Sequence, residues 1–93
     1  MTKISVIMPV YNTKPIYLEK AIESILHQTL EDFKFLILND SPENPYIKDI
    51  VKKYNDKRVL YYEHTSNLGI ARSYNHLLSL ADTKYIALMN HDD

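Results

Sequence analysis

The sequence predicts an α/β fold in which strands of a parallel sheet alternate with helices. Four short apolar runs, rich in β-branched and aromatic residues, predict strands at 4–10, 33–40, 58–64 and 84–90. The three segments between them repeat apolar residues at helical spacing. Alternation of this kind favours a parallel sheet with right-handed helical crossovers. A chain of 93 residues has room for one such domain.

The first strand, 4–10, is short, apolar and β-branched, as in a buried strand, and Pro9 interrupts it. The helix expected over 14–30 has Pro15 in its first turn, where proline is tolerated. Its apolar face is formed by Leu18, Ala21, Ile22, Ile25 and Leu26. The second strand, 33–40, is again a nearly continuous apolar run, so we expect it to lie next to the first in the core.

The second helix is expected within 41–56, with Asn44 as its N-cap and Pro45 at its first position. Lysines 52 and 53 suit the negative end of its dipole. Its inward face contains Ile47, Ile50, Val51 and Tyr54. The third helix is expected over 67–82, between the third and fourth strands. Its inward residues are predicted to be Ile70, Tyr74, Leu77, Leu78 and Ala81.

Composition narrows the class of protein. The net charge of −1 offers no electrostatic support for binding nucleic acid, and the absence of cysteine excludes disulfides and thiolate metal sites. No apolar run approaches the roughly 20 residues that span a bilayer. The first residues lack the apolar length and cleavage site of a signal peptide. We therefore expect a cytoplasmic protein, or a soluble part of one.

Polar residues follow every predicted strand. In parallel sheets, ligands bind beyond the carboxyl ends of the strands, so these residues are the candidates for a site. Tyr11 and Asn12 follow the first strand, and Asp40 lies at the end of the second. His64 lies at the end of the third strand, and Asn90, His91, Asp92 and Asp93 lie at the end of the fourth. The sequence thus predicts a polar site at one edge of the sheet.

The residue types at this edge suit a nucleotide and a metal ion, although each residue could also have a role that involves no ligand. Asp92 and Asp93 could bind Mg²⁺ or Mn²⁺, or simply be solvated. Tyr11 could stack on a base or pack structurally. Asp40 could accept a hydrogen bond from a base N–H or act only in a turn. The histidines at 27, 64 and 76 show no metal-ligand spacing with one another.

Three stretches of the chain carry a resemblance to a known family: "ISVIMPVYN", "ESILHQTLEDFKFLILNDS" and "NLGIARSYNHLLSLADTKYIALMNHDD". Together they resemble the nucleotide-binding part of a family 2 glycosyltransferase with the Rossmann-like GT-A fold. The resemblance implies that Tyr11, between Val10 and Asn12, packs on the base and that Asp40 reads the uracil ring N–H. It places Asn67, Gly69 and Arg72 beside the donor, and Asp92 and Asp93 on Mn²⁺ or Mg²⁺ at the diphosphate.

Two positions carry an amide where the family pattern has an acid. Asn39 stands where the first acid of the second-strand pair is usual, and Asn90 stands where the metal motif usually begins with an acid. The second departure leaves open whether Asp92 or Asp93 contacts the metal. A third difference concerns the turn after Asp40, which reads Ser41-Pro42 rather than Gly-Ser and is therefore stiffer.

The resemblance implies a metal-dependent enzyme that transfers a sugar from a UDP-sugar to an acceptor hydroxyl with inversion. Residues 1–93 would be its nucleotide-sugar-binding part, truncated after the fourth strand, without the acceptor region or a catalytic base. Such a part would bind donor nucleotide without transferring sugar. The alternatives are a non-catalytic nucleotide-binding remnant and a receiver-like signalling domain. An uncovered edge or face at the fourth strand would favour a homodimer.

Overall fold

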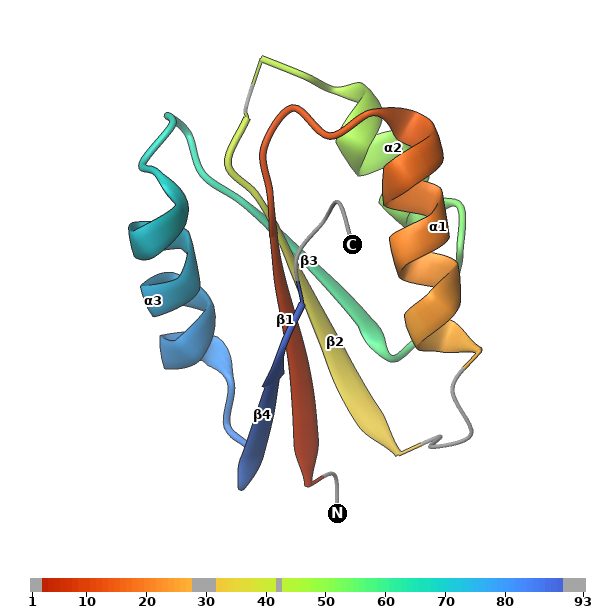
Figure 1. Ribbon diagram of the computed structural model, residues 1–93, viewed down its shortest axis with the longest axis vertical. Helices are drawn as coiled ribbons and strands as arrows, with labels where there is room; N and C mark the ends of the chain where they lie inside the picture. The colour runs from red at the N-terminus through yellow and green to blue at the C-terminus, as the bar shows by residue number, and fades with distance from the viewer. Residues whose placement is uncertain (1–2, 28–31, 42, 90–93) are drawn as a thin grey trace.

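A computed structural model describes residues 3–27, 32–41 and 43–89. These residues form four strands and three helices in strict alternation (Figure 1). The elements are β1 (Ile4–Val10), α1 (Pro15–Leu26), β2 (Phe33–Asn39), α2 (Tyr46–Lys52), β3 (Val59–Glu63), α3 (Ile70–Leu80) and β4 (Tyr85–Leu88). The strands pair in parallel in the order β3-β2-β1-β4. The predicted α/β fold is therefore confirmed.

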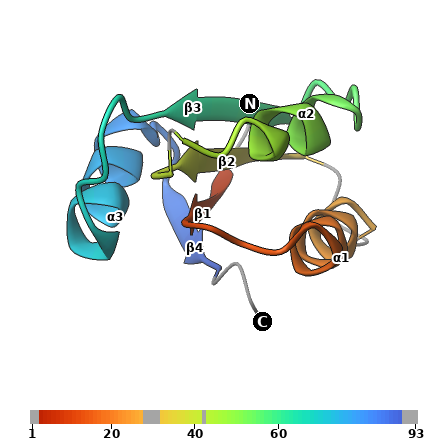
Figure 2. The same cartoon turned by 90° about the horizontal axis from the view of Figure 1, so that it is seen from above.

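The helices divide between the two faces of the sheet. Helices α1 and α2 lie on one side and α3 on the other (Figures 1 and 2). Alternate residues of β1 and β2 contribute to the two cores, so both faces of these strands are apolar. Met8 and Phe35 face α1 and α2, whereas Ile7 and Leu36 pack with Leu77 of α3. No helix in the described part of the chain is long and apolar enough to cross a membrane.

Helix α1 matches its predicted face. Pro15 opens the helix, and Leu18, Ala21 and Ile22 are buried. Ile25 and Leu26 are partly buried against the same core, as expected.

Helix α2 begins differently from the prediction. The residue at its N-cap is Pro45, with no side-chain cap, so the prediction of Asn44 as N-cap is wrong. The side chain of Asn44 instead donates a hydrogen bond to the side-chain oxygen of Asn12 after β1. The side-chain contact of Asn44 is therefore with a distant segment and not with the helix. Ile47 and Val51 are buried as predicted.

Helix α3 buries a narrower stripe than its sequence suggests. Ser73 and Leu77 are its buried residues, one helical turn apart. Ile70 is 59% exposed and Leu78 is 42% exposed, so their prediction as inward residues is wrong. Ser73 was not among the predicted inward residues, and its buried hydroxyl donates to the carbonyl of Gly69 at 2.9 Å. Among the described elements α3 is the one helix on this face, so it has no second helix to bury its flanks.

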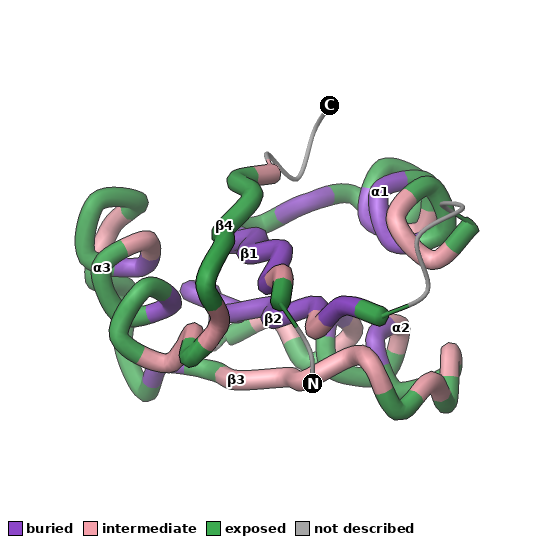
Figure 3. Tube along the Cα trace, turned by 90° about the horizontal axis from the view of Figure 1, so that it is seen from below, coloured by how far each residue is buried: buried purple, intermediate pink, exposed green. Residues whose placement is uncertain are grey.

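Strand β4 is the exposed edge of the sheet. It pairs with β1 on one side, and no described strand pairs with its other side. All four of its residues are exposed (Figure 3). Leu88 is 66% exposed and Tyr85 is 56% exposed. The expected uncovered edge is therefore present in the described chain.

Candidate functional site

The parallel register brings three polar residues together at the carboxyl edge of the sheet. The amide of Asp40 donates to the carbonyl of Val10 at 2.7 Å, which extends the β1–β2 pairing past the end of β2. The amide of His64 likewise donates to the carbonyl of Asn39 at 3.0 Å, which extends the β2–β3 pairing. Tyr11, Asp40 and His64 therefore follow three neighbouring strands.

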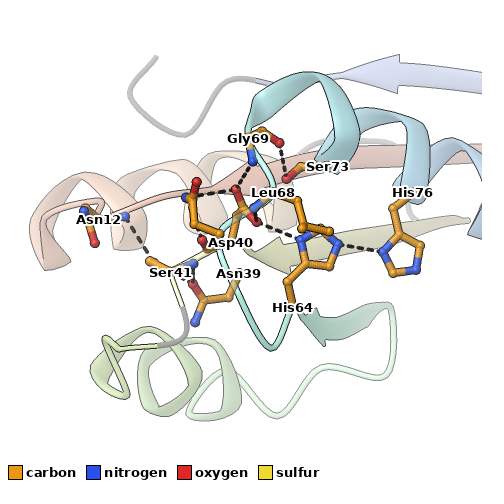
Figure 4. A network of polar contacts seen from close by, with 10 residues as sticks. Asn12, Asn39, Asp40, Ser41, His64, Leu68, Gly69, Ser73 and His76 are labelled. Atoms are coloured by element: carbon orange, nitrogen blue, oxygen red, sulfur yellow. Dashed lines mark hydrogen bonds and ion pairs between the residues drawn. The ribbon is translucent and has the colours of Figure 1, made fainter.

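Asp40 is the centre of this edge, and its side chain is buried with a residue exposure of 3%. Oδ1 accepts hydrogen bonds from His64 Nδ1 at 2.7 Å and from the amide of Leu68 at 2.9 Å. Oδ2 accepts from the amide of Gly69 at 2.9 Å and from Asn67 Nδ2 at 3.2 Å (Figure 4). Since a carboxylate has about four acceptor positions, each position of Asp40 is occupied.

These contacts determine the ionisation of Asp40. Burial by itself raises the pKa of a carboxyl group, since it penalises the charged form. The hydrogen bonds from His64 and from the amides of Leu68 and Gly69 outweigh burial, so the pKa of Asp40 lies below its ordinary value. Asp40 is therefore an anion at neutral pH. A role in a turn does not by itself account for Asp40, because its carboxylate also accepts hydrogen bonds from the residues just before α3.

His64 and His76 form a contact that sequence reasoning missed. His64 Nε2 lies 2.9 Å from His76 Nδ1, and the two rings are nearly parallel, at 6° (Figure 4). His64 is 7% exposed, whereas His76 lies on the exposed side of α3. The pair has no metal spacing in sequence, and its members come from different elements. The one available signal was that His64 directly follows a strand, as Asp40 does.

A second network supports the end of β1. Asn39 Oδ1 accepts hydrogen bonds from the amide of Ser41 at 2.9 Å and from its hydroxyl at 2.7 Å. The Ser41 hydroxyl accepts from the amide of Asn12 at 3.2 Å. Asn12 has a φ of 51°, a left-handed conformation that asparagine tolerates. This network anchors the turn that carries Tyr11.

The same network explains the amide at position 39. Asn39 Nδ2 donates to the Tyr61 hydroxyl at 3.1 Å while Oδ1 accepts from Ser41. An ionised carboxylate accepts hydrogen bonds but cannot donate one. Asn39 therefore serves two kinds of partner, which the acid usual at this position could not. Pro42, the other departure in this turn, lies outside the described residues.

A pocket of about 320 Å³ opens between the ends of β1 and β2 and the start of α3. Tyr11 is 49% exposed at this pocket, so part of its ring is accessible. The lining residues are Pro9, Val10, Tyr11, Asp40, Asn67, Gly69, Ile70 and Ser73. Small-molecule pockets usually measure about 300–1,000 Å³, so this one suits part of a ligand such as a base.

The other predicted site residues are placed differently. Asn12 is outside the pocket lining, although its amide supports the neighbouring turn. Arg72 is exposed in the first turn of α3 and is also outside the lining. Asp92 and Asp93, the predicted metal ligands, lie outside the described residues. Within residues 3–27, 32–41 and 43–89, no group of three or more His, Asp or Glu side chains is arranged to hold a metal ion.

A larger hollow of about 630 Å³ lies between α2 and β3. Its lining includes Lys48, Lys52 and Lys57 and shares no residue with the pocket at Asp40. We assign the site to the smaller pocket, because the buried carboxylate of Asp40 lies in its wall, where the ends of β1 and β2 meet the start of α3. The position of that pocket at the carboxyl edge of a parallel sheet is typical of Rossmann-like α/β domains.

Comparison with known families assigns the chain to one of them. The model of glycosyl transferase family 2 matches residues 5–93. The chain belongs to this family, as the resemblance implied. Nothing in the match supports the receiver-like alternative.

Two curated relatives illustrate the match. An uncharacterized glycosyltransferase of Methanocaldococcus jannaschii is 41% identical over 92 residues, which cover 97% of this chain and 32% of the relative. The minor teichoic acid biosynthesis protein GgaB of Bacillus subtilis is 38% identical over 94 residues, covering 96% of this chain and 10% of that protein. The chain therefore spans a third or less of the length of these relatives.

Solved structures confirm the GT-A fold. S. aureus TarS, in complex with UDP-GlcNAc, aligns with a TM-score of 0.86 and 24% identity over 98% of this chain and 27% of that chain. A mannosyltransferase of Pyrobaculum calidifontis, in complex with GDP-Man and Mn²⁺, aligns with a TM-score of 0.81 and 19% identity. That alignment covers 97% of this chain and 27% of the mannosyltransferase.

Proposed function

We propose that this chain is the donor-nucleotide part of a metal-dependent glycosyltransferase that moves a sugar from a UDP-sugar to an acceptor hydroxyl with inversion. The observation that carries the proposal is the pocket in which the ring of Tyr11 is accessible and the anionic Asp40 forms part of the wall. Family membership supports the reaction class. The complexes of structural neighbours with UDP-GlcNAc and GDP-Man support a nucleotide-sugar donor.

Tyr11 and Asp40 bind the base in this proposal. The flat ring of Tyr11 stacks on it, and a ring N–H of uracil donates to Asp40. The carboxylate already has four donors, so the base must replace one of them. The contact from Asn67 Nδ2 is the longest of the four, at 3.2 Å, and Asn67 is an exposed residue. Its amide is therefore the donor that yields to the base.

The diphosphate and the metal are proposed to bind at the same edge of the sheet. Arg72, an exposed cation in the first turn of α3, is the proposed partner of the diphosphate, while Val10 and Asn12 hold the turn around Tyr11. Strand β4 runs parallel to β1, so its carboxyl end points to this same edge. Asp92 and Asp93 supply the hard oxygen ligands that Mn²⁺ or Mg²⁺ prefers. A metal there would neutralise charge on the diphosphate as a Lewis acid.

The 93 residues are proposed to bind the donor without completing the transfer. Transfer to a hydroxyl needs a general base, and none of the residues assigned above is placed to serve as one. The relatives extend well beyond the matched region, which leaves ample chain for an acceptor site and a base.

Calorimetric titration with UDP, with and without Mn²⁺, tests the proposal. Separate titrations with ADP and GDP measure the specificity for the base. We expect UDP to bind more tightly than ADP or GDP, and more tightly with Mn²⁺ than without it. Because base stacking contributes about 1–3 kcal/mol, Tyr11→Ala should weaken UDP binding about tenfold. Tyr17→Ala is the matched control, since Tyr17 on α1 is also 49% exposed but lies outside the pocket.

Equal effects of the two tyrosine substitutions would contradict the stacking role. Absence of UDP binding to a folded chain would contradict the donor-site proposal itself. Binding in this chain without transfer by a longer one would favour the alternative of a non-catalytic nucleotide-binding remnant.

A further inference from the structure

Among the described residues, the proposed function leaves one buried titratable side chain without a role, that of His64. Its ring lies between Asp40 Oδ1 at 2.7 Å and His76 Nδ1 at 2.9 Å. His64 is not part of the pocket lining, so it touches the proposed ligand only through Asp40. Figure 4 shows the three side chains in a row, from Asp40 through His64 to His76 on α3.

The two oxygens of Asp40 have different surroundings. The partners of Oδ2, Gly69 and Asn67, both line the pocket. The partners of Oδ1, His64 and Leu68, do not. The partners of Oδ1 therefore lie outside the pocket lining, and Oδ2 is the oxygen that a ligand in the pocket can reach.

The hydrogen bonds determine which nitrogen of His64 carries a proton. An ionised Asp40 only accepts, so Nδ1 of His64 must donate to it. In the neutral ring Nε2 then lacks a proton and accepts from Nδ1–H of His76. In the imidazolium form Nε2 donates to His76 instead. In both states the proton that Asp40 needs remains on Nδ1 of His64.

We propose that His64, oriented by His76, is a positioning residue that holds Oδ1 of Asp40 and so presents Oδ2 to the base of the donor nucleotide. The proposal rests on the proposed donor site. His76 acts by stabilising the tautomer in which His64 donates to Asp40. Without His76, Nε2 of the buried His64 would lose its partner and the other tautomer would compete.

Few other charged groups face the pair in the described chain. Asp40 is the acid in contact with it. Arg72 lies four residues before His76 on α3, which places it on the same side of the helix. Glu63 precedes His64, but neighbouring strand residues point to opposite faces, and its carboxylate is the partner of the Tyr61 hydroxyl at 3.1 Å. The tautomer of His64 is therefore determined mainly by Asp40 and His76.

Nitrogen-15 NMR of the histidine rings in the unliganded chain tests the first half of the proposal. We expect a protonated Nδ1 on His64 in the wild type. His76→Leu removes the partner of Nε2 and should produce a mixture of tautomers, together with a shift of the Asp40 carboxyl carbon. His76→Asn restores a side-chain N–H near the position of Nδ1 and should restore both signals. His27→Leu is the control, because His27 is exposed at the end of α1.

UDP titration of the same variants tests the second half. Since a neutral hydrogen bond contributes about 0.5–1.5 kcal/mol, His76→Leu should weaken UDP binding about two- to tenfold. His76→Asn and His27→Leu should bind as the wild type does.

A protonated Nε2 on His64 in the wild type, or unchanged His64 and Asp40 signals in His76→Leu, would overturn the proposal. So would unchanged UDP affinity in His76→Leu. If UDP does not bind although the NMR signals respond as expected, the proposed donor site fails. The assignment of Oδ2 to a base is then overturned with it, while the histidine pair still orients Asp40.

Discussion

The edge around Asp40 and strand β4 belong to one small sheet but differ in which side chains they bury and which they expose. At the Asp40 edge, polar side chains are buried, and no buried side-chain nitrogen or oxygen of the described residues lacks a hydrogen-bond partner. At β4, apolar side chains are exposed, and no described strand pairs with the outer edge. In the first region the buried polar groups are hydrogen-bonded within the described chain. In the second, apolar side chains face solvent and the backbone groups of the outer edge have no described strand to pair with.

This difference shows that the two regions depend on different parts of the molecule. Asp40, His64 and the start of α3 constrain one another, so this part of the site is organised by contacts inside the described chain. Among the described strands β4 pairs on one edge only, so a surface that covers its other edge would stabilise it. The predictions below test this contrast, from the largest expected effect to the smallest.

The same substitution in the two regions should give the largest difference. Leu38 of β2 is fully buried beside Leu77, whereas Leu88 of β4 is 66% exposed. Leu38→Ala should lower the free energy of unfolding by about 3 kcal/mol, because it leaves a cavity in the core. Leu88→Ala should change it by about 0.5 kcal/mol or less. Urea denaturation measures both, and similar losses would contradict the contrast.

Replacing the buried acid should have the next largest effect. Asp40→Asn puts an amide group among four donors, so we expect a loss of about 2 kcal/mol in unfolding free energy at pH 7. The folded-state pKa of Asp40 lies below the ordinary 3.8. Its contribution is therefore complete above pH 3.8 and is lost as the pH falls through the lower folded value. The gap between wild type and variant should close over that range, as urea denaturation at several pH values would show.

A gap between Asp40→Asn and wild type that stays constant down to pH 2 would contradict a role for the charge. The substitution would then act through shape alone.

The edge of β4 should promote self-association. Dimerisation is a proposal, based on the unpaired edge and on the exposed side chains of β4. Ile86→Lys places a charge on this strand and should weaken association about tenfold. Ile16→Lys is the control, since Ile16 is exposed on α1, away from β4. Light scattering over a range of concentrations measures the effect, and a wild-type chain that stays monomeric would count against the proposal.

The smallest effect is expected for an acid beside β4. Asp82, between α3 and β4, pairs with Lys34 at 3.0 Å, and its side chain is 72% exposed. Lys34 lowers the pKa of Asp82, yet solvent and salt screen an exposed pair of this kind. Asp82→Asn should therefore leave the denaturation midpoint unchanged within error. A loss comparable to that of Asp40→Asn would show that hydrogen-bonded burial is not what distinguishes the two acids.

Much of the fold could be predicted from local patterns. The order of strands and helices follows from apolar periodicity, and Pro15 marks the start of α1 as expected. The inward face of α3 was harder to predict, because periodicity shows which residues share a face but not how much of that face is covered. Ile70 and Leu78 share the apolar side of α3 with Leu77, yet both are exposed while Leu77 is buried against the sheet.

Part of the site could also be predicted, because strand ends in a parallel sheet meet at one edge. Tyr11, Asp40, Asn67 and Gly69 line one pocket, as the motif positions suggested. Their roles toward a ligand, and those of Asp92 and Asp93 toward a metal, remain predictions. The sequence placed His64 at the end of a strand but gave no signal for its contacts, because its partners are 24 and 12 residues away.

The sequence by itself determined the alternation of strands and helices, the parallel sheet and the edge at which polar residues gather. These features depend on local periodicity and on the apolar character of short segments, which act within a few residues. Only the tertiary structure decided which donors surround Asp40, that His64 contacts His76, and how little of the apolar side of α3 is buried. Those outcomes depend on distances between side chains of different elements, and packing sets such distances only after the whole sheet has formed.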